Sequence, residues 1–138
     1  MERKLDEWIK IYEKKTGEEF KPSDGFKLFF FPTRGFAEIR VTDKMVIIAQ
    51  LCGDMMFWRN LVEFLSQAIG YKYAGTYCIR NIKAYIRLCG FTINNTETLD
   101  DGLKRYFCTD KHGKKGQVSP AWISNRTGHA GYYIVWEV

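Results

Sequence analysis

Residues 45–60, MVIIAQLCGDMMFWRN, constrain the fold of this chain more than any other segment. Residues 45–51 are almost continuously apolar, which is typical of a strand buried on both faces. Gly53 then favours a turn, and the apolar residues after it recur at helical spacing. A strand that leads through a glycine turn into a helix directs the unpaired N–H groups of the helix toward one point, where an anion binds readily.

The rest of the chain alternates between helical and extended patterns. Residues 2–16 have amphipathic helical spacing, and residues 26–51 read as an antiparallel meander in which residues 45–51 form the most buried strand. Residues 109–118 are polar and basic and are expected to form a loop. Further helices are expected at 55–69 and 81–89, and further strands at 75–79, 91–96, 103–108 and 132–138. The order predicts an α+β fold in a single domain over residues 1–138, with a mixed, largely antiparallel sheet flanked by helices.

Composition limits the class of protein. Hydrophobic residues make up 46% of the 138 residues, enough for the core of one domain. No apolar run is long enough to cross a bilayer, and the charged N-terminus is unlike a signal peptide, so we expect a cytoplasmic protein without membrane contact. The four cysteines form no CxxC pair and there are only two histidines, so we expect buried, reduced thiols and no metal site.

The net charge of +5 raises the question of a nucleic-acid partner. The basic residues are spread along the chain, and their densest group is at residues 111–115 with Arg105 nearby. Such an excess is compatible with phosphate contact and equally with a solvated loop. No helix-turn-helix, zinc-finger or RRM signature accompanies it.

Two local motifs resemble the acyl-CoA N-acyltransferase (GNAT) family. The hexamer at residues 50–55 resembles the family's Gln/Arg-x-x-Gly-x-Gly/Ala motif, with Met55 in place of the last small residue. Asn81, Ala84 and the Gly-Phe pair at 90–91 resemble a second motif, at a shorter interval. The resemblance covers residues 26–108 and implies a GNAT-like fold, with acyl-CoA as cofactor and possible N-acyltransferase activity on an unknown acceptor.

The resemblance also implies roles for particular residues. The cofactor diphosphate would be held by Gln50, Leu51, Cys52, Gly53, Asp54 and Met55, with Asn81 across the cleft. Tyr85 lies near the position of the family's tyrosine acid, which protonates the CoA thiolate. Glu38 is the candidate general base, since residues 45–51 offer no Glu or His.

The same residues allow other interpretations. Asp is a preferred N-cap, so Asp54 could satisfy the helix amides that a diphosphate needs and would also repel it. Glu38 lies on a strand whose alternation is also that of a solvent face. Cys108 and His112 lie four residues apart, but nothing supplies the orienting partner that a thiol nucleophile requires.

Over most of its length the chain also resembles small proteins encoded by bacteriophages and prophages of Gram-positive bacteria. The segments LDEWIKIYEKKTG, PTRGFAEIRV and IRNIKAYIRLCGF carry this likeness. It implies the cytoplasm of a bacterial host and an alternative function, a non-catalytic accessory protein that binds a host protein or nucleic acid. The basic C-terminal region would then make the contact, and its aromatic candidates are Trp122, Tyr132, Tyr133 and Trp136.

Overall fold

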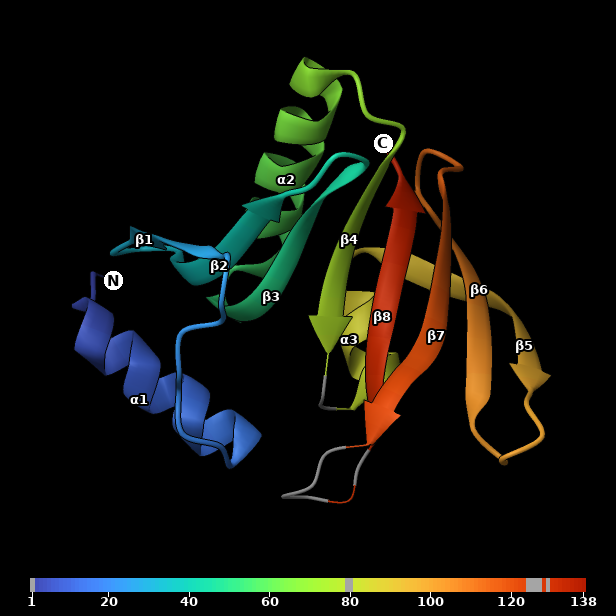
Figure 1. Cartoon of the computed structure of the whole chain (residues 1–138), viewed down its shortest axis with the longest axis horizontal. Coiled ribbons are helices and arrows are strands. Elements are labelled where there is room, and N and C mark those ends of the chain that lie inside the picture. The colour runs from blue at the N-terminus through green and yellow to red at the C-terminus, as the bar shows by residue number, and fades with distance from the viewer. Residues whose placement is uncertain (1, 79–80, 124–127, 129) are drawn as a thin grey trace.

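The computed structural model describes residues 2–78, 81–123, 128 and 130–138. Within these residues the chain forms three α helices and eight strands (Figure 1). The helices are α1 (Leu5–Thr16), α2 (Met55–Ile69) and α3 (Ile82–Leu88). The strands are β1 (Lys27–Phe31), β2 (Gly35–Val41), β3 (Met45–Gly53), β4 (Tyr73–Cys78), β5 (Phe91–Thr98), β6 (Lys104–Asp110), β7 (Lys115–Ile123) and β8 (Ala130–Glu137).

All strands join one eight-stranded sheet in the order β1-β2-β3-β4-β8-β7-β6-β5. β3 and β4 run parallel, and the other neighbouring pairs run antiparallel. A parallel pair needs a crossover, which α2 supplies. The α+β class and the mixed, largely antiparallel sheet are therefore confirmed.

The helices cover the two faces of the sheet unequally. α1 packs on one face of β2 and β3, in a cluster built around Tyr12, Phe36 and Cys52. α2 and α3 pack on the opposite face, where the main core includes Trp58 and Ile86, both fully buried. On the face that α1 occupies, no helix of the described chain lies over β4, β8, β7 and β6, as Figure 1 shows.

β7 contradicts the expected loop over residues 109–118, because the strand begins at Lys115. Charged and polar residues of this segment alternate with the buried Gly116 and Val118, which is a strand pattern of period two. Pro120, which argues against a central strand, lies where the β7–β8 register shifts. Proline is tolerated at such irregularities because the ladder is already interrupted there.

A bulge in β3 separates the two parallel strands. Ala37 pairs with Leu51 and Ile39 with Ile48, so β3 carries one more residue than β2 between these pairs. The extra residue falls at Ala49 and Gln50. The β3–β4 ladder ends just before it, at the pair Ile48 and Thr76. Beyond this point β3 stays with β2 and β4 stays with β8, so the parallel strands diverge.

Candidate functional site at the divergence of two parallel strands

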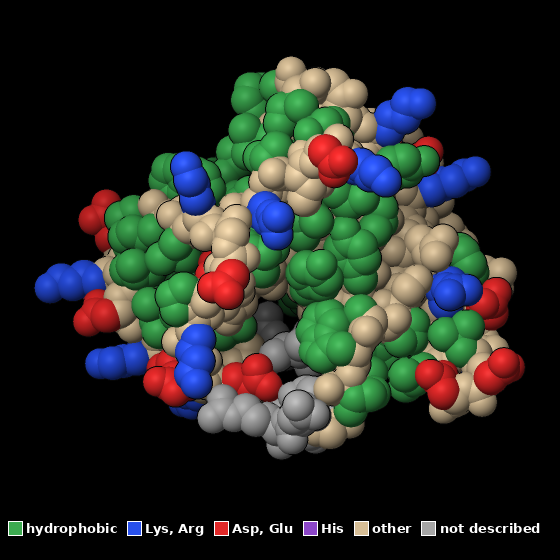
Figure 2. All heavy atoms as spheres, viewed as in Figure 1, with side chains coloured by type: hydrophobic (Ala, Val, Ile, Leu, Met, Phe, Trp, Pro, Cys, Tyr) green, Lys and Arg blue, Asp and Glu red, His purple; other side chains and the backbone are tan. Residues whose placement is uncertain are grey.

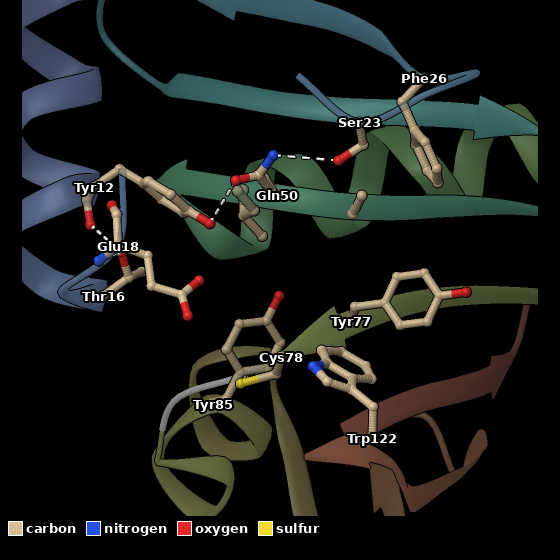
Figure 3. A pocket seen from close by; sticks show the side chains of 12 residues that line it. Tyr12, Thr16, Glu18, Ser23, Phe26, Gln50, Tyr77, Cys78, Tyr85 and Trp122 are labelled. Atoms are coloured by element: carbon tan, nitrogen blue, oxygen red, sulfur yellow. Dashed lines mark hydrogen bonds between the residues drawn. The ribbon is translucent and has the colours of Figure 1, made fainter. Parts of the chain in front are cut away.

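A cavity of about 410 Å³ opens where β3 and β4 diverge. Figure 2 shows a hollow in the middle of the face that α1 occupies, and Figure 3 shows the residues that line the cavity. One wall comes from α1, the connector after it and β3, and the other from β4, α3 and β7. The lining residues are Tyr12, Thr16, Glu18, Ser23, Phe26, Ala49, Gln50, Leu51, Tyr77, Cys78, Tyr85 and Trp122. Leu51 and Tyr85 belong to the core on the far face, so the cavity reaches into the gap between the strands.

Gln50, which the bulge places on the α1 side, organises the first wall. Its Oε1 accepts a hydrogen bond of 2.8 Å from the hydroxyl of Tyr12. Its Nε2 donates to the Lys21 carbonyl at 2.7 Å and to Glu38 Oε1 at 2.7 Å. Gln50 therefore ties β3 to α1 and to the connector that follows α1 (Figure 3).

Glu38 lies behind Gln50 and is only 1% exposed. Its Oε2 accepts from the backbone N–H of Ser23 and its Oε1 from the Ser23 hydroxyl, both at 2.8 Å. A buried carboxylate is stable only when such donors replace its water. The interpretation of Glu38 as a solvent-facing residue is wrong, and both of its oxygens are engaged in holding the connector against the sheet.

The opposite wall is aromatic. The hydroxyl of Tyr85 lies 3.1 Å from Oγ1 of Thr76 and faces the cavity (Figure 3). Trp122 packs edge-on against Tyr77 with ring centroids 5.6 Å apart. A Cβ at Gly131 would lie 2.0 Å from the Trp122 ring, so glycine is needed there for the indole to lie close to β8.

Glu18 brings an acidic group to this aromatic cavity, because its carboxylate points into the space between the two walls (Figure 3). Sequence reasoning missed Glu18 and Trp122 as lining residues. Glu18 lies in a polar connector whose sequence does not distinguish it from an ordinary loop. The side of the sheet to which Trp122 points depends on the irregular register of β7 and β8. The polar run after α1 is the only signal that hinted at a functional connector.

The turn into α2 differs from an open anion site. Oδ1 of Asp54 accepts from the N–H of Phe57 at 3.0 Å, so Asp54 caps the helix. Arg34 lies 2.5 Å from Oδ2 of Asp54. The Phe57 N–H, opposed by partial burial and supported by the Arg34 guanidinium, lowers the pKa of Asp54 below its ordinary value. A carboxylate therefore occupies the place where a diphosphate would approach the helix.

Backbone packing requires a glycine at position 53. Its φ is +112°, and a Cβ there would lie 2.2 Å from the carbonyl oxygen of Arg34. The glycine is required by the approach of the β1–β2 turn, whose Gly35 meets Cys52 in the same way. Close approach of backbone to backbone thus explains the glycine that the sequence associates with a ligand.

The structure distributes the expected cofactor residues over several places. Gln50 and Leu51 line the cavity together with Tyr85. Cys52 packs in the α1 cluster, and Met55 packs in the main core. Asn81 caps α3 by accepting from the N–H of Ala84 at 3.2 Å.

The four cysteines are buried thiols that form no disulfide, as expected. Burial raises the pKa of Cys108 to about 11, and its Sγ lies 3.3 Å from the Gly116 carbonyl, to which it donates. Burial likewise raises the pKa of Cys89 to about 12. Thiols with such a high pKa stay protonated at neutral pH and are poor nucleophiles. His112 is exposed, so a Cys108–His112 pair gains no support.

Among the described residues, no group of His, Cys, Asp or Glu could hold a metal ion. In the same part of the chain, every helix is too short or too polar to span a bilayer. Comparisons of the chain with protein-family models, with curated proteins and with solved structures gave no match.

Proposed function

We propose that the protein binds an acyl-CoA, with the acyl–pantetheine arm in the cavity between β3 and β4. The observation that carries this proposal is the end of the β3–β4 ladder at Ile48 and Thr76, directly beside a cavity of about 410 Å³. Two diverging strand edges offer backbone groups to an extended, amide-containing ligand, as sheet edges do to peptides. The cavity volume also lies in the range of small-molecule sites.

The lining would support transfer of the acyl group to an amine. The amine attacks the thioester carbon, the C–N bond forms, and the C–S bond breaks to release the CoA thiolate. The ammonium proton of the intermediate passes to Glu18, whose carboxylate points into the cavity. The thiolate takes a proton from the hydroxyl of Tyr85, which the contact with Thr76 holds in place. Positioning of the two reactants supplies most of the rate.

Glu38, the base expected from the sequence, is a less suitable proton acceptor. Its oxygens accept from Ser23 and Gln50, and taking a proton would break one of these bonds. In this proposal Glu38 positions Gln50 and the connector.

The diphosphate of CoA would have to displace the cap of α2 if it bound at residues 50–55. Asp54→Asn removes the repulsion and keeps a capping side chain. We expect this variant to bind CoA as tightly as the native protein or more tightly. Weaker binding would contradict the repulsion between Asp54 and a diphosphate bound at residues 50–55.

Calorimetric titration with acetyl-CoA and with free CoA tests the proposal. Ala49→Phe fills the cavity from β3 and should abolish binding, and Leu88→Phe, at an exposed position on α3, is the matched control. Tyr85→Phe should retain binding and slow any acyl transfer. Equal affinity of Ala49→Phe and native protein, or no binding of either ligand at millimolar concentration, would overturn the proposal.

A further inference from the structure

The uncovered face of β4, β8, β7 and β6 extends away from the cavity, with Tyr77 at the border between the two. On β4, Tyr73, Gly75 and Tyr77 point to this face, alternating with the buried Ala74 and Thr76. The same alternation on the neighbouring strands brings further side chains to it. They are Tyr133, Val135 and Glu137 on β8, Lys115, Gln117 and Ser119 on β7, and Arg105 and Phe107 on β6.

Aromatic rings pack closely together on part of this face. The Tyr133 ring lies over Gly75, where a Cβ would come within 2.7 Å of its hydroxyl oxygen. Tyr133 also stacks on Tyr77, with centroids 4.8 Å apart and planes inclined by 25°. Both rings are partly exposed, and a partly exposed ring can stack with a planar group that approaches.

The register places two more aromatic residues around Tyr133. Phe107 pairs with Gln117, and Gln117 with Val135, which puts Phe107 in the same row across the strands as Gly75. Tyr73 pairs with Glu137 at the end of the face and is 45% exposed. A groove of about 520 Å³ runs among these residues and is also lined by Lys115, Gln117 and Ser119.

Lysines lie near one end of the groove, which Glu137 also lines. Lys115 lines it directly, and Lys72 immediately precedes Tyr73. Lys44 immediately precedes Met45, which pairs with Tyr73. All three lysines are exposed. Figure 2 shows Lys and Arg side chains at this end of the molecule, with acidic side chains beside them.

We propose that this face binds single-stranded nucleic acid. Bases would stack on Tyr133, Phe107 and Tyr73, and phosphates would follow the lysines at the end of the groove. Unpaired bases stack on aromatic side chains whatever their identity, and cationic side chains along the backbone add salt-dependent affinity. Gln117 and Ser119 supply hydrogen-bonding groups for base edges between the rings.

The test is fluorescence anisotropy of a labelled oligo(dT) and oligo(U) of about 12 nucleotides, the length that one such platform covers. We expect binding that weakens with salt, and a duplex of the same length should bind more weakly. Tyr73→Ala should reduce affinity by roughly 5-fold or more, the range for loss of one stacked base. Phe64→Ala removes a more exposed ring, on α2, and should leave affinity unchanged.

The lysines are tested by Lys72→Gln with Lys115→Gln, which should lower the slope of log affinity against log salt by about 0.7 per lost phosphate contact. Lys10→Gln with Lys14→Gln on α1 is the matched control. Binding that is insensitive to salt, equal affinity for duplex, or equal loss in the α1 control would overturn the proposal. So would a protein dimer that Tyr73→Ala dissociates, because the face would then be covered by a second copy.

Acyl-CoA titration of the same variants separates this proposal from the first, because Tyr73, Lys72 and Lys115 do not line the cavity.

Discussion

Nη2 of Arg59 lies 2.6 Å from Oδ2 of Asp110, and both side chains are less than 7% exposed. The same guanidinium contacts Oε1 of Glu63 at 2.9 Å and lies over the ring of Phe91 at 4.2 Å. Trp136 donates to the same Glu63 oxygen at 2.9 Å. One arginine thus joins α2 to strands from the far half of the sheet through contacts that exclude water.

Arg59→Met should strongly destabilise the protein. The substitution keeps an apolar stem but leaves Asp110 and Glu63 without their cation in a buried site, which costs about 3–5 kcal/mol. Urea unfolding followed by circular dichroism measures the change. Arg105→Met breaks a pair with Glu97 that is one-third to one-half exposed, and should cost less than about 1 kcal/mol. Similar losses in the two variants would contradict the structural role of Arg59.

Stability should fall in acid partly because of Asp110. Burial raises the pKa of this carboxyl. The N–H groups of Lys114 and His112 and the Arg59 guanidinium lower the pKa by more than burial raises it, so the net shift is downward. The ionised carboxylate therefore stabilises the fold above its unfolded pKa of about 4, and this contribution is lost as the pH falls through the lower folded value.

Unfolding measured between neutral and strongly acidic pH checks this expectation. Asp110→Asn should be less stable at neutral pH and should show a shallower decline in acid. Asp54→Asn removes the other carboxylate with a lowered pKa, at a side chain that is 37% exposed, so solvent screening should make its effect smaller. An unchanged acid profile for Asp110→Asn would contradict the assignment.

Glu38→Gln should loosen the connector after α1. The amide has one acceptor oxygen in place of two, so one of the donors from Ser23 and Gln50 loses its partner, at a cost of about 1–3 kcal/mol. Hydrogen exchange should show faster exchange at the Ser23 amide. Ser23→Ala keeps the backbone bond to Glu38, so its effect on that amide should be smaller. Slow exchange at Ser23 in Glu38→Gln would show that the carboxylate does not hold the connector.

Gly53→Ala should destabilise the protein in the absence of any ligand. The added Cβ would meet the Arg34 carbonyl oxygen at 2.2 Å, and two backbones would have to move apart. Gly102→Ala provides the control, since Gly102 also has a positive φ but nothing lies within 4 Å of its Cβ. The control should cost about 1–2 kcal/mol from backbone strain alone, and Gly53→Ala clearly more. Equal thermal stability of the two variants would argue that the contact relaxes freely.

Local signals predicted much of the architecture. Asn81 is an N-cap by its chemistry, and the apolar run before Gly53 forms a buried strand that leads into α2, as the sequence indicates. β7 escaped prediction because its charged residues and Pro120 mask a period-two pattern that only its neighbours in the sheet make stable.

The sequence by itself determined the order of the elements apart from β7, the class of sheet and the buried state of the cysteines, because these follow from periodicity, turn chemistry and apolarity along the chain. Only the tertiary structure decided the site. The bulge at Ala49 and Gln50, the approach of Arg34 to Gly53 and the shared cavity that Glu18 and Trp122 line depend on segments that are distant in the chain. Such contacts depend on sheet register and packing, which a single local pattern does not specify.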